Sequence, residues 1–408
     1  MYKNQATAAL AFTRKIVDSF GPRLTGSEAC GRAAESILDE AKPFADKAQI
    51  ERFAVHPGAF LGFIKVLVIF YIVAAASMVF VPLASALLST LSICILVFGF
   101  FLYREVLDPF FPKVEGRNVV AVLEPEGKAE AQLILSGHHD SARIFNFYVN
   151  RPELYSRKVY GGIGSVVMLW LVSIAVAAVS GWGLGTPVFG FDLLRLLAGL
   201  AFLAALPLVL PLWNFASDEG TPGAGDNMAA TAIALEVFKE FAQRRKAGKG
   251  LKRTRLVFAS FDAEEAGLRG ARAFALQRKA EFATLPTYGY NMDCIFNVDD
   301  LRILTSDLND FVKLDAGAVE RLAALAADEG IKAPKAPLAF LTGGTDAAEL
   351  QAAGARAASL VAMHWGNDAR ANAYHTPADT IDAVDPAAVE ALLRLGIRFA
   401  EDIDAKNL

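Results

Sequence analysis

Two stretches of the chain are apolar on every face that a helix would present. The first spans residues 61–103, where Pro82 separates two runs, and the second spans residues 161–213. Each run is near the ~20 residues that a helix needs to cross the hydrocarbon core of a membrane. A soluble core helix rarely remains apolar all round for this length, so four buried core helices are the less favoured interpretation. The pattern predicts two transmembrane α-helical hairpins inserted into the chain.

The remaining segments, 1–60, 104–160 and 214–408, alternate between helical and extended hydrophobic periods and predict one α/β domain that is interrupted twice. Helices are expected at 5–19, 27–42, 226–241, 310–329 and 386–402, and another from about residue 268. Strands are expected at 47–55, 118–123, 132–136, 256–261, 295–298 and 357–361. Such an alternation is typical of a mixed, mostly parallel sheet flanked by helices.

Charge and cysteine content narrow the functional classes. The formal net charge of the 408 residues is −4, with both signs spread along the chain and no basic arm, so a nucleic-acid partner is not expected. The three cysteines, Cys30, Cys94 and Cys294, are far apart and predict no disulfide framework. Together with the lack of a recognisable signal peptide at the start, this pattern favours a reducing compartment.

Two adjacent acids, Glu264 and Glu265, follow the apolar run 256–261 and precede a helix. Ligands of open α/β sheets bind beyond the carboxyl ends of the strands. Neighbouring carboxylates repel each other unless a cation or a shared proton relieves them. A solvated acidic turn is the alternative, and the choice depends on what else the chain brings to this edge.

Histidines and further carboxylates follow other expected strands and turns. His138 and Asp140 come after the strand at 132–136 and face one side of an extended chain, whereas His139 faces the other and is expected to be structural or solvent-facing. Asp226 precedes a helix as a ligand or an N-cap, and His375 lies in a loop. Zinc takes nitrogen and oxygen ligands, and catalytic sites leave one position open, so this set predicts a metal site.

Five short motifs in a fixed order carry a family resemblance. They are His-x-Asp at 138–140, Gly-x-Gly-Asp-Asn at 223–227, Glu-Glu-x-Gly-Leu-x-Gly at 264–270, Asn-x-Asp at 297–299 and Tyr-His-Thr-x-x-Asp-Thr at 374–380. The chain outside the apolar stretches thereby resembles the M28 family of di-zinc aminopeptidases, which implies the zinc exopeptidase fold. The resemblance includes Gly-Pro-Arg-Leu-Thr-Gly-Ser at 21–27 and Thr-Gly-Gly-Thr-Asp at 342–346.

The resemblance also implies two zinc ions, or other divalent metals, and a role for each motif residue. One metal would be held by His138 and Asp299, the other by Glu265 and His375, with Asp226 between them, Glu264 as general base and Asp140 supporting His138. Asp300 and Asp293 are alternatives to Asp299. Ala347 stands where the family has the histidine of Ser-Asp-His, so the substrate contacts of that loop are expected to differ.

These features predict a membrane-anchored zinc exopeptidase that removes N-terminal residues from peptides, with a peptide substrate and the lipid bilayer as partners. Two other functions remain open: a catalytically silent binding scaffold, and a one-zinc acyltransferase related to glutaminyl cyclases, which share the fold. The number of bound metals separates them. The residues do not indicate an oligomeric state.

Flanking charge and strand direction predict how the protein sits in the membrane. The catalytic side of the hairpins carries Arg104, Lys113, Arg143, Arg151, Arg157 and Lys158, whereas the opposite loops carry only Arg195. The positive-inside rule then makes the catalytic domain cytoplasmic, in a bacterial inner membrane. The strands at 118–123 and 132–136 are too close in sequence for a parallel crossover and should run in opposite directions. Both hairpins would then leave the sheet edge that carries His138, and the active-site mouth would face the membrane.

Overall fold

The structure is a computed structural model that describes residues 2–179, 192–364 and 372–405. The chain folds into two compact units. The first, the α/β unit, comprises residues 1–57, 113–144 and 218–408. The second, the helical unit, comprises residues 58–112 and 145–217, and so contains both apolar stretches.

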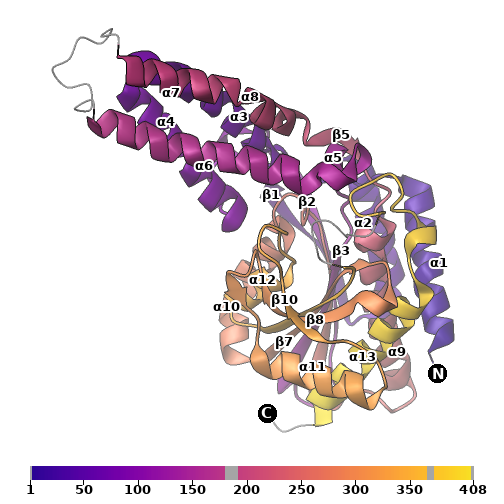
Figure 1. Cartoon of the computed structure of the whole chain (residues 1–408). Helices are drawn as coiled ribbons and strands as arrows, with labels where there is room; N and C mark the ends of the chain where they lie inside the picture. The colour runs from indigo at the N-terminus through magenta and orange to yellow at the C-terminus, as the bar shows by residue number, and fades with distance from the viewer. Residues whose placement is uncertain (1, 180–191, 365–371, 406–408) are drawn as a thin grey trace. The chain divides into compact units, whose positions relative to one another are not determined.

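A nine-stranded mixed sheet forms the centre of the α/β unit (Figure 1). The strand order is β1-β2-β6-β3-β7-β11-β8-β10, and β9 pairs with β8. The strands are β1 (Lys47–Val55), β2 (Val114–Leu123), β3 (Ala131–His138), β6 (Thr254–Phe261), β7 (Thr287–Ile295), β8 (Leu301–Asp307), β9 (Val312–Lys313), β10 (Lys335–Pro337) and β11 (Arg356–Ala362). The adjacent strands β6, β3, β7 and β11 are parallel, whereas β1 and β2 are antiparallel to their neighbours. The predicted mixed sheet with a parallel core is confirmed.

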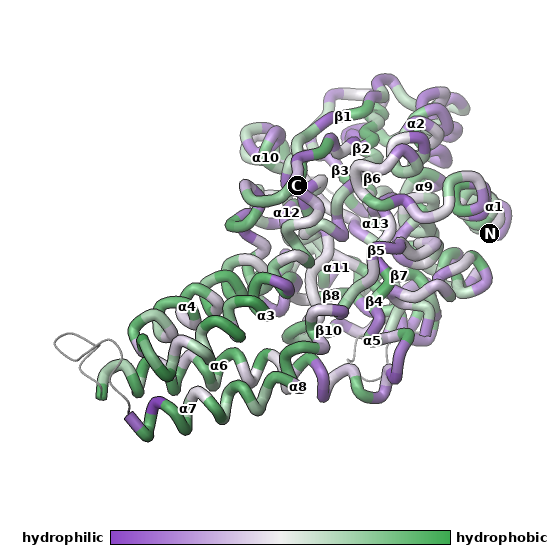
Figure 2. Tube along the Cα trace, turned by 90° about the horizontal axis from the view of Figure 1, so that it is seen from above, coloured by the Kyte–Doolittle hydropathy of each residue, from purple (hydrophilic) through white to green (hydrophobic). Residues whose placement is uncertain are grey.

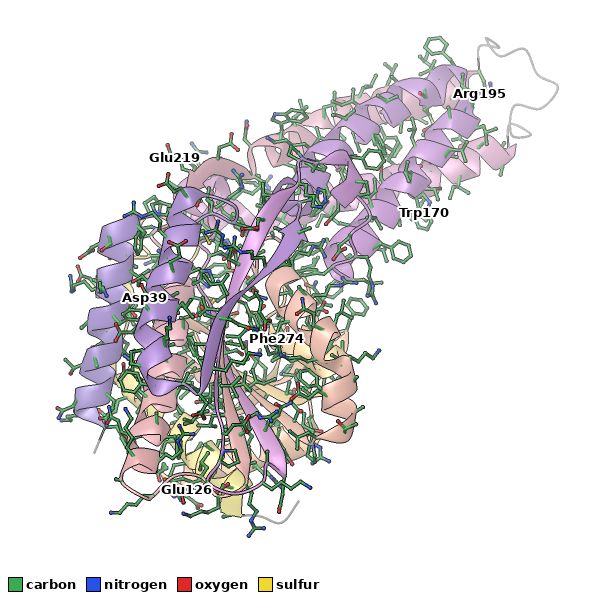
Figure 3. All side chains as sticks on the ribbon, turned by 180° about the vertical axis from the view of Figure 1, so that it is seen from behind. Asp39, Glu126, Trp170, Arg195, Glu219 and Phe274 are labelled. Atoms are coloured by element: carbon green, nitrogen blue, oxygen red, sulfur yellow. The ribbon has the colours of Figure 1, made fainter. Side chains whose placement is uncertain are left out.

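Helices cover the sheet because its central strands are buried along their whole length and expose no polar face. The helices are α1 (Lys3–Phe20), α2 (Glu28–Ala41), α9 (Ala229–Lys246), α10 (Arg269–Thr284), α11 (Ala316–Asp328), α12 (Ala347–Ala352) and α13 (Pro386–Ala405). Helices α1, α9 and α13 pack against one another, and α9 also packs on β3. On α10, Phe274 meets Phe261 of β6 with ring centroids 5.3 Å apart (Figure 3).

The strand directions agree with the prediction, but the neighbours differ. β2 runs antiparallel to β6, and β3 runs parallel to β6, so β2 and β3 point in opposite directions. β6 lies between them, so the short turn around Pro125 does not join a hairpin. The start of β2 therefore lies at the same end of the sheet as His138, and this is the end at which Val55 pairs with Val114.

Four helices of the helical unit are long and apolar enough to cross a membrane, judged by length and composition. The candidate spans are Pro57–Phe80, Pro82–Phe101, Pro152–Val179 and Leu193–Asn214. They contain α3 (Pro57–Phe80), α4 (Pro82–Ile95), α6 (Tyr155–Val179), α7 (Leu193–Ala204) and α8 (Leu206–Val209). Figure 2 shows these helices as almost continuously hydrophobic. The Gly/Pro-rich loop that the sequence predicts at 181–187, between the last two spans, lies outside the described residues.

The apolar helices expose large hydrophobic side chains and bury several serine hydroxyls. Leu87, Met168 and Leu197 are each more than half exposed. In contrast, the buried hydroxyls of Ser89 on α4 and Ser173 on α6 lie 2.7 Å apart. Helices in lipid use such interhelical hydrogen bonds, because lipid tails give no hydrophobic drive between helices. By length, composition and exposed apolar surface, these helices are candidates for membrane spans.

Candidate metal centre

Side chains from three neighbouring strand ends and two loops converge in the α/β unit. His138 ends β3, Glu264 and Glu265 follow β6, and Asp293 lies near the end of β7. The site is completed by Asp226, in the segment before α9, and His375, in the loop before α13. Ligand atoms of His138, Asp226 and Glu265 lie within 4.8 Å of one another, and so do those of His138, Glu264 and Asp293. Both groups could hold a metal ion.

Asp226 lies between two histidines and turns one carboxylate oxygen toward each. Its Oδ1 is 3.3 Å from His138 Nε2, and its Oδ2 is 3.1 Å from His375 Nε2. Glu265 Oε1 is 3.4 Å from the same His375 nitrogen. The alternative role of Asp226 as a helix N-cap is not observed, because α9 begins at Ala229. This placement suits a carboxylate shared by two cations.

The donor set around His138 fits a cation better than it fits protein hydrogen bonds. Its Nε2 lies 3.3 Å from Asp226 Oδ1, 3.7 Å from Glu264 Oε2 and 3.9 Å from Asp293 Oδ1. One ring nitrogen can carry only one hydrogen, so it cannot serve three carboxylates. All four residues are at most 8% exposed, so solvent does not relieve the crowding. Imidazole nitrogen and carboxylate oxygens are ligands that zinc accepts.

Close packing of α9 on β3 places His138. A Cβ on Gly137 would come within 2.8 Å of both the Ala230 Cβ and the Thr231 backbone nitrogen, so only glycine allows this approach. Thr231 Oγ1 then donates a hydrogen bond of 3.0 Å to the carbonyl oxygen of His138. The strand end and the helix are thereby held together beneath the site.

Asp140 connects the histidine to the glutamate pair. Its Oδ1 lies 3.3 Å from His138 Nδ1 and accepts the backbone N–H of Glu264 at 3.2 Å. Its Oδ2 accepts the backbone N–H of Glu265 at 3.1 Å and the Thr25 hydroxyl at 3.2 Å. Outer partners of this kind fix the orientation of metal ligands. Asp140 is therefore placed to hold both segments, whereas the sequence predicted only that it supports His138.

Two residues of the recognised motifs have structural roles that the sequence did not assign. Arg23, fully buried, donates to the backbone carbonyls of Gly21, His139, Pro222 and Gly223, and so joins the loops that carry His138 and Asp226. Asp379 accepts the N–H groups of Gly225, at 2.7 Å, and Asp226, at 3.2 Å. Their only signal in the sequence was their place within the Gly-Pro-Arg and Tyr-His-Thr-x-x-Asp motifs.

The structure places Asp299 outside the cluster and corrects its assignment as a ligand. β7 ends at Ile295, and Asp299 and Asp300 lie on the turn Val298–Asp300, where Asp299 is exposed. Asp293 is instead buried, with its Oδ1 facing His138. The strand was expected to cover 295–298, so its carboxyl end was placed too late in the chain. Asp293, one of the alternatives left open, takes the position of Asp299.

The loop that departs from the family pattern also contributes a buried acid. Asp346 precedes α12 and is 1% exposed, and neither of its carboxylate oxygens has a hydrogen-bond partner among the described residues. Burial raises the pKa of Asp346 well above its usual value, while the nearby His138 acts in the opposite direction. Ala347, which stands at the histidine position of the family pattern, is fully buried.

Burial and mutual repulsion hold protons in this site when no cation is bound. Burial raises the pKa of Asp293 to about 7, and it raises those of Glu264 and Glu265 as well. Burial alone would lower the pKa of His375, but the carboxylates of Glu265 and Asp226 raise it to about 9. Bound divalent cations would replace these protons, because ligands must be deprotonated to bind metal.

The metal-free protein is expected to lose stability as the pH rises from 5 to 9. Asp293 and His375 both bind protons more tightly when folded, with pKa values of about 7 and 9 against ordinary values of 3.8 and 6.5. Their contribution is therefore full at low pH and is lost as the pH rises through those folded values. The two histidines lower the pKa of Asp226 below its ordinary value of 3.8 despite its burial. Ionised Asp226 therefore stabilises the folded protein at higher pH, and this stabilisation is lost only below pH 4. Thermal unfolding of chelator-treated protein in detergent measures this.

Added zinc should flatten that dependence, since the cations take the place of the protons. The melting temperature should then change little over the same pH range. A metal-free protein that becomes more stable toward pH 9 would contradict the electrostatic description of the site.

A matched pair of substitutions tests the corrected ligand. Asp293→Asn should lower metal content and activity, because it removes a buried carboxylate facing His138. Asp299→Asn should leave both unchanged, because Asp299 is exposed on the turn after β7. Metal analysis of the purified variants reads out both. Loss of metal from Asp299→Asn with full retention in Asp293→Asn would restore the original assignment.

Comparisons with known proteins identify a family and a fold. Residues 212–400 match the model of peptidase family M28, a segment that includes every candidate ligand except His138. No curated protein sequence matches the chain. Among solved structures, the chain is similar to a Zn-dependent exopeptidase from Parabacteroides distasonis, with 13% identity, a TM-score of 0.56 and 97% coverage of each chain.

Two other solved structures resemble the chain to the same degree. One is a leucine aminopeptidase precursor from Bacteroides thetaiotaomicron, with 11% identity, a TM-score of 0.55 and coverage of 97% of this chain and 96% of that one. The other is a glutaminyl cyclase from Porphyromonas gingivalis, with 13% identity, a TM-score of 0.56 and 98% coverage of each. At these identities the likeness establishes the fold, and the chemistry depends on the site.

Proposed function

We propose that this chain, which belongs to peptidase family M28 through residues 212–400, is a membrane-anchored aminopeptidase with two divalent cations at its centre. The observation that carries the proposal is the position of Asp226, with one carboxylate oxygen toward each of two histidines. A site for a single metal would not require a second histidine beside the other oxygen of the same carboxylate. Two cations sharing this carboxylate are the arrangement expected for hydrolysis by paired metals.

The residues divide into two sets around Asp226. His138 and Asp293 would hold one cation, and Glu265 and His375 would hold the other. Bound zinc would supply a Lewis acid for the scissile carbonyl and a lowered pKa for the attacking water. Asp140 contacts the imidazole of His138 and accepts the backbone N–H groups of both glutamates, and so holds these groups in place around the two cation positions.

Glu264 is the residue best placed to move the proton. It follows β6 directly, is 8% exposed and turns its Oε2 toward the centre, 3.7 Å from His138 Nε2. Its pKa is raised by burial, which brings a carboxylate closer to the range in which a general base both accepts and returns a proton. Glu264 would take the proton from the attacking water and deliver it to the leaving amine.

A panel of N-terminal substrates tests the activity directly. The purified protein in detergent would be given aminoacyl reporters and peptides, including peptides with N-terminal glutamine, with and without a chelator. We expect release of free N-terminal residues that stops on chelation and returns with zinc, and about two metal equivalents per chain that depend on Asp226. Cyclisation of N-terminal glutamine with a single metal would instead identify an acyltransferase, and no turnover with no bound metal would identify a binding scaffold.

The helical unit supports the membrane part of the proposal. Its four apolar helices have the length of membrane spans and expose large hydrophobic side chains. Basic residues gather in the sequence segments that connect the apolar helices to the α/β unit, and Arg195, near the start of α7, is the basic residue that the sequence assigns to the opposite side. By the positive-inside rule, the α/β unit would be cytoplasmic, in a bacterial inner membrane. Peptide substrates would then come from the cytoplasm or from the membrane surface.

Cysteine labelling of two exposed positions tests the topology. Phe80, at the end of α3, is 54% exposed, and the Asp218 side chain is 97% exposed. In a Cys94→Ala background, Asp218→Cys should react with an impermeant thiol reagent from the cytoplasmic side, and Phe80→Cys only from the opposite side. The other two cysteines are buried and should stay silent. Both positions should react in detergent, and reaction of both from one side in intact vesicles would refute the four-span topology.

A further inference from the structure

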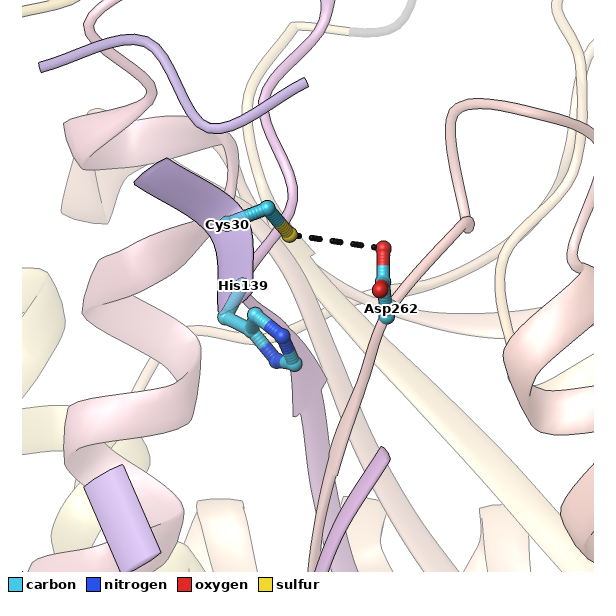
Figure 4. Close-up of side chains that lie close together, drawn as sticks. All are labelled: Cys30, His139 and Asp262. Atoms are coloured by element: carbon cyan, nitrogen blue, oxygen red, sulfur yellow. Dashed lines mark hydrogen bonds between the residues drawn. The ribbon is translucent and has the colours of Figure 1, made fainter. Parts of the chain in front are cut away.

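A second group of metal-ligating side chains lies beside the candidate centre and takes no part in it. Cys30 comes from α2, His139 follows β3, and Asp262 follows β6 (Figure 4). One ligand atom from each lies within 4.8 Å of those of the other two. All three residues are at most 2% exposed. His139 and His138 are neighbours in an extended segment, so their side chains point to opposite sides and serve different groups.

One ring nitrogen of His139 is buried without a hydrogen bond. His139 Nδ1 lies 2.8 Å from Ser260 Oγ, whereas Nε2 has no hydrogen-bond partner among the described residues. That unpartnered ring nitrogen is available to act as a ligand. An unpartnered polar atom at a fully buried position requires an explanation, and a missing cation is one such explanation.

The other two side chains are held in place by neighbours outside the group. Cys30 Sγ lies 3.4 Å from Asp262 Oδ1 (Figure 4). The second carboxylate oxygen of Asp262 accepts the backbone N–H of Arg117 at 2.8 Å, and the Asp262 N–H donates to Asn118 Oδ1 at 3.0 Å. Contacts of this kind orient ligands before a metal binds. The hydroxyl of Ser260 orients the imidazole in the same way.

We propose that Cys30, His139 and Asp262 form a third cation site, which binds zinc or a similar thiolate-seeking divalent metal. Thiolate, imidazole and carboxylate are all zinc ligands, and the thiolate sulfur disfavours magnesium and calcium. The thiol releases its proton to solvent when the metal binds, so one thiolate and one carboxylate together balance the two charges of the cation. The nearby guanidinium of Arg23 directs its hydrogen bonds to four backbone carbonyls and does not occupy the group.

The positions of the three residues in the fold indicate a structural role for this site. It would join α2 to the ends of β3 and β6, and those two strand ends lead directly to His138 and to Glu264. The three side chains are closed off from solvent and from substrate, which favours a structural role. This inference does not depend on the proposed aminopeptidase activity.

Metal analysis of the full-length protein, purified in detergent from zinc-supplemented cells, tests the proposal. X-ray absorption at the zinc edge should show a sulfur neighbour at about 2.3 Å in the wild-type protein. Cys30→Ser should contain one metal equivalent fewer than the wild type and lose the sulfur signal. Protein grown with cobalt should show a thiolate-to-cobalt absorption band that the same substitution removes. Cys94→Ser, at an exposed cysteine, is the matched control and should change nothing.

Three results would overturn the proposal. The first is a wild-type zinc spectrum without sulfur, which needs no variant and holds even if Cys30→Ser does not fold. The second is an unchanged metal content in a folded Cys30→Ser protein. The third is loss of the sulfur signal in Cys294→Ser but not in Cys30→Ser, because Cys294 lies within reach of Asp226 and Asp293 and would then be the sulfur ligand of the main centre. Absence of peptidase activity alongside a zinc–sulfur signal would refute the proposed function alone.

Discussion

Glu264→Gln is expected to lower kcat by roughly 10²–10⁴-fold, the contribution typical of a general base, with the metal content and the fold unchanged. The amide has nearly the shape of the carboxylate but cannot accept the proton from the attacking water. The backbone N–H of Glu264 would still bond to Asp140, so the segment after β6 should keep its position. Steady-state kinetics on the best reporter substrate, with metal analysis on the same preparation, measures both quantities.

The neighbouring glutamate is the matched control. Glu265→Gln removes an oxygen that lies 3.4 Å from His375 Nε2, so it should lower metal occupancy together with activity. The two variants differ by one position in the same turn, which separates proton transfer from metal binding. Full activity of Glu264→Gln, or a loss of metal from it equal to that of Glu265→Gln, would show that the two roles are assigned wrongly.

Asp226→Asn is expected to release both cations and abolish turnover. The substitution removes the charge that faces His138 and His375 at the same time. Changes to outer-shell partners already cost about 10–100-fold in metal affinity, so loss of a shared ligand should cost at least the upper end of that range. The effect is measured as metal content after gel filtration in buffer that contains a chelator. The wild-type protein and Asp299→Asn are treated in the same way for comparison.

The number of metals lost decides the role of this aspartate. Release of two equivalents supports a carboxylate shared between the two halves of the centre. Release of one equivalent, with the other half intact, would make Asp226 a terminal ligand and would remove the observation that carries the proposed two-metal chemistry. A cation bound to Cys30, His139 and Asp262 should remain in either case, because Asp226 takes no part in that group.

Much of the architecture was predictable because it depends on short-range periodicity. Apolar runs of membrane length, buried strands and amphipathic helices are properties of consecutive residues, and the structure places most of them close to the expected ranges. The strand expected at 295–298 is an exception, because it shares only Ile295 with β7. The glutamate pair was also predictable, since Glu264 and Glu265 follow an unbroken apolar strand. His138 and His139 were separable for the same reason, because alternate residues of a strand face opposite sides. His139 proved to be buried, so of its two expected roles the structural one holds.

The candidate metal ligand on β7, Asp293, could not be singled out from the local sequence. The pairing of β7 with β11 shifts register between Val361↔Asp293 and Ala362↔Ile295, which leaves Cys294 as an extra residue with φ of 54°. Such a bulge re-aims the side chains beside it, and it depends on the partner strand and not on the residues near Asp293. From the sequence alone, Asp299 was the preferred ligand, and Asp293 and Asp300 stayed open as alternatives.

The sequence by itself determined which segments are long and apolar enough to cross a membrane, which segments form most of the central strands and which residue types meet at the sheet edge, because hydrophobic period and short motifs act over a few residues. Only the tertiary structure decided that β6 lies between β2 and β3 and that Asp293 replaces Asp299. It also decided that Arg23 joins two distant loops and that Cys30 meets His139 and Asp262. Each of these depends on contacts between residues about a hundred or more positions apart, or on the register of paired strands, and no local pattern encodes them.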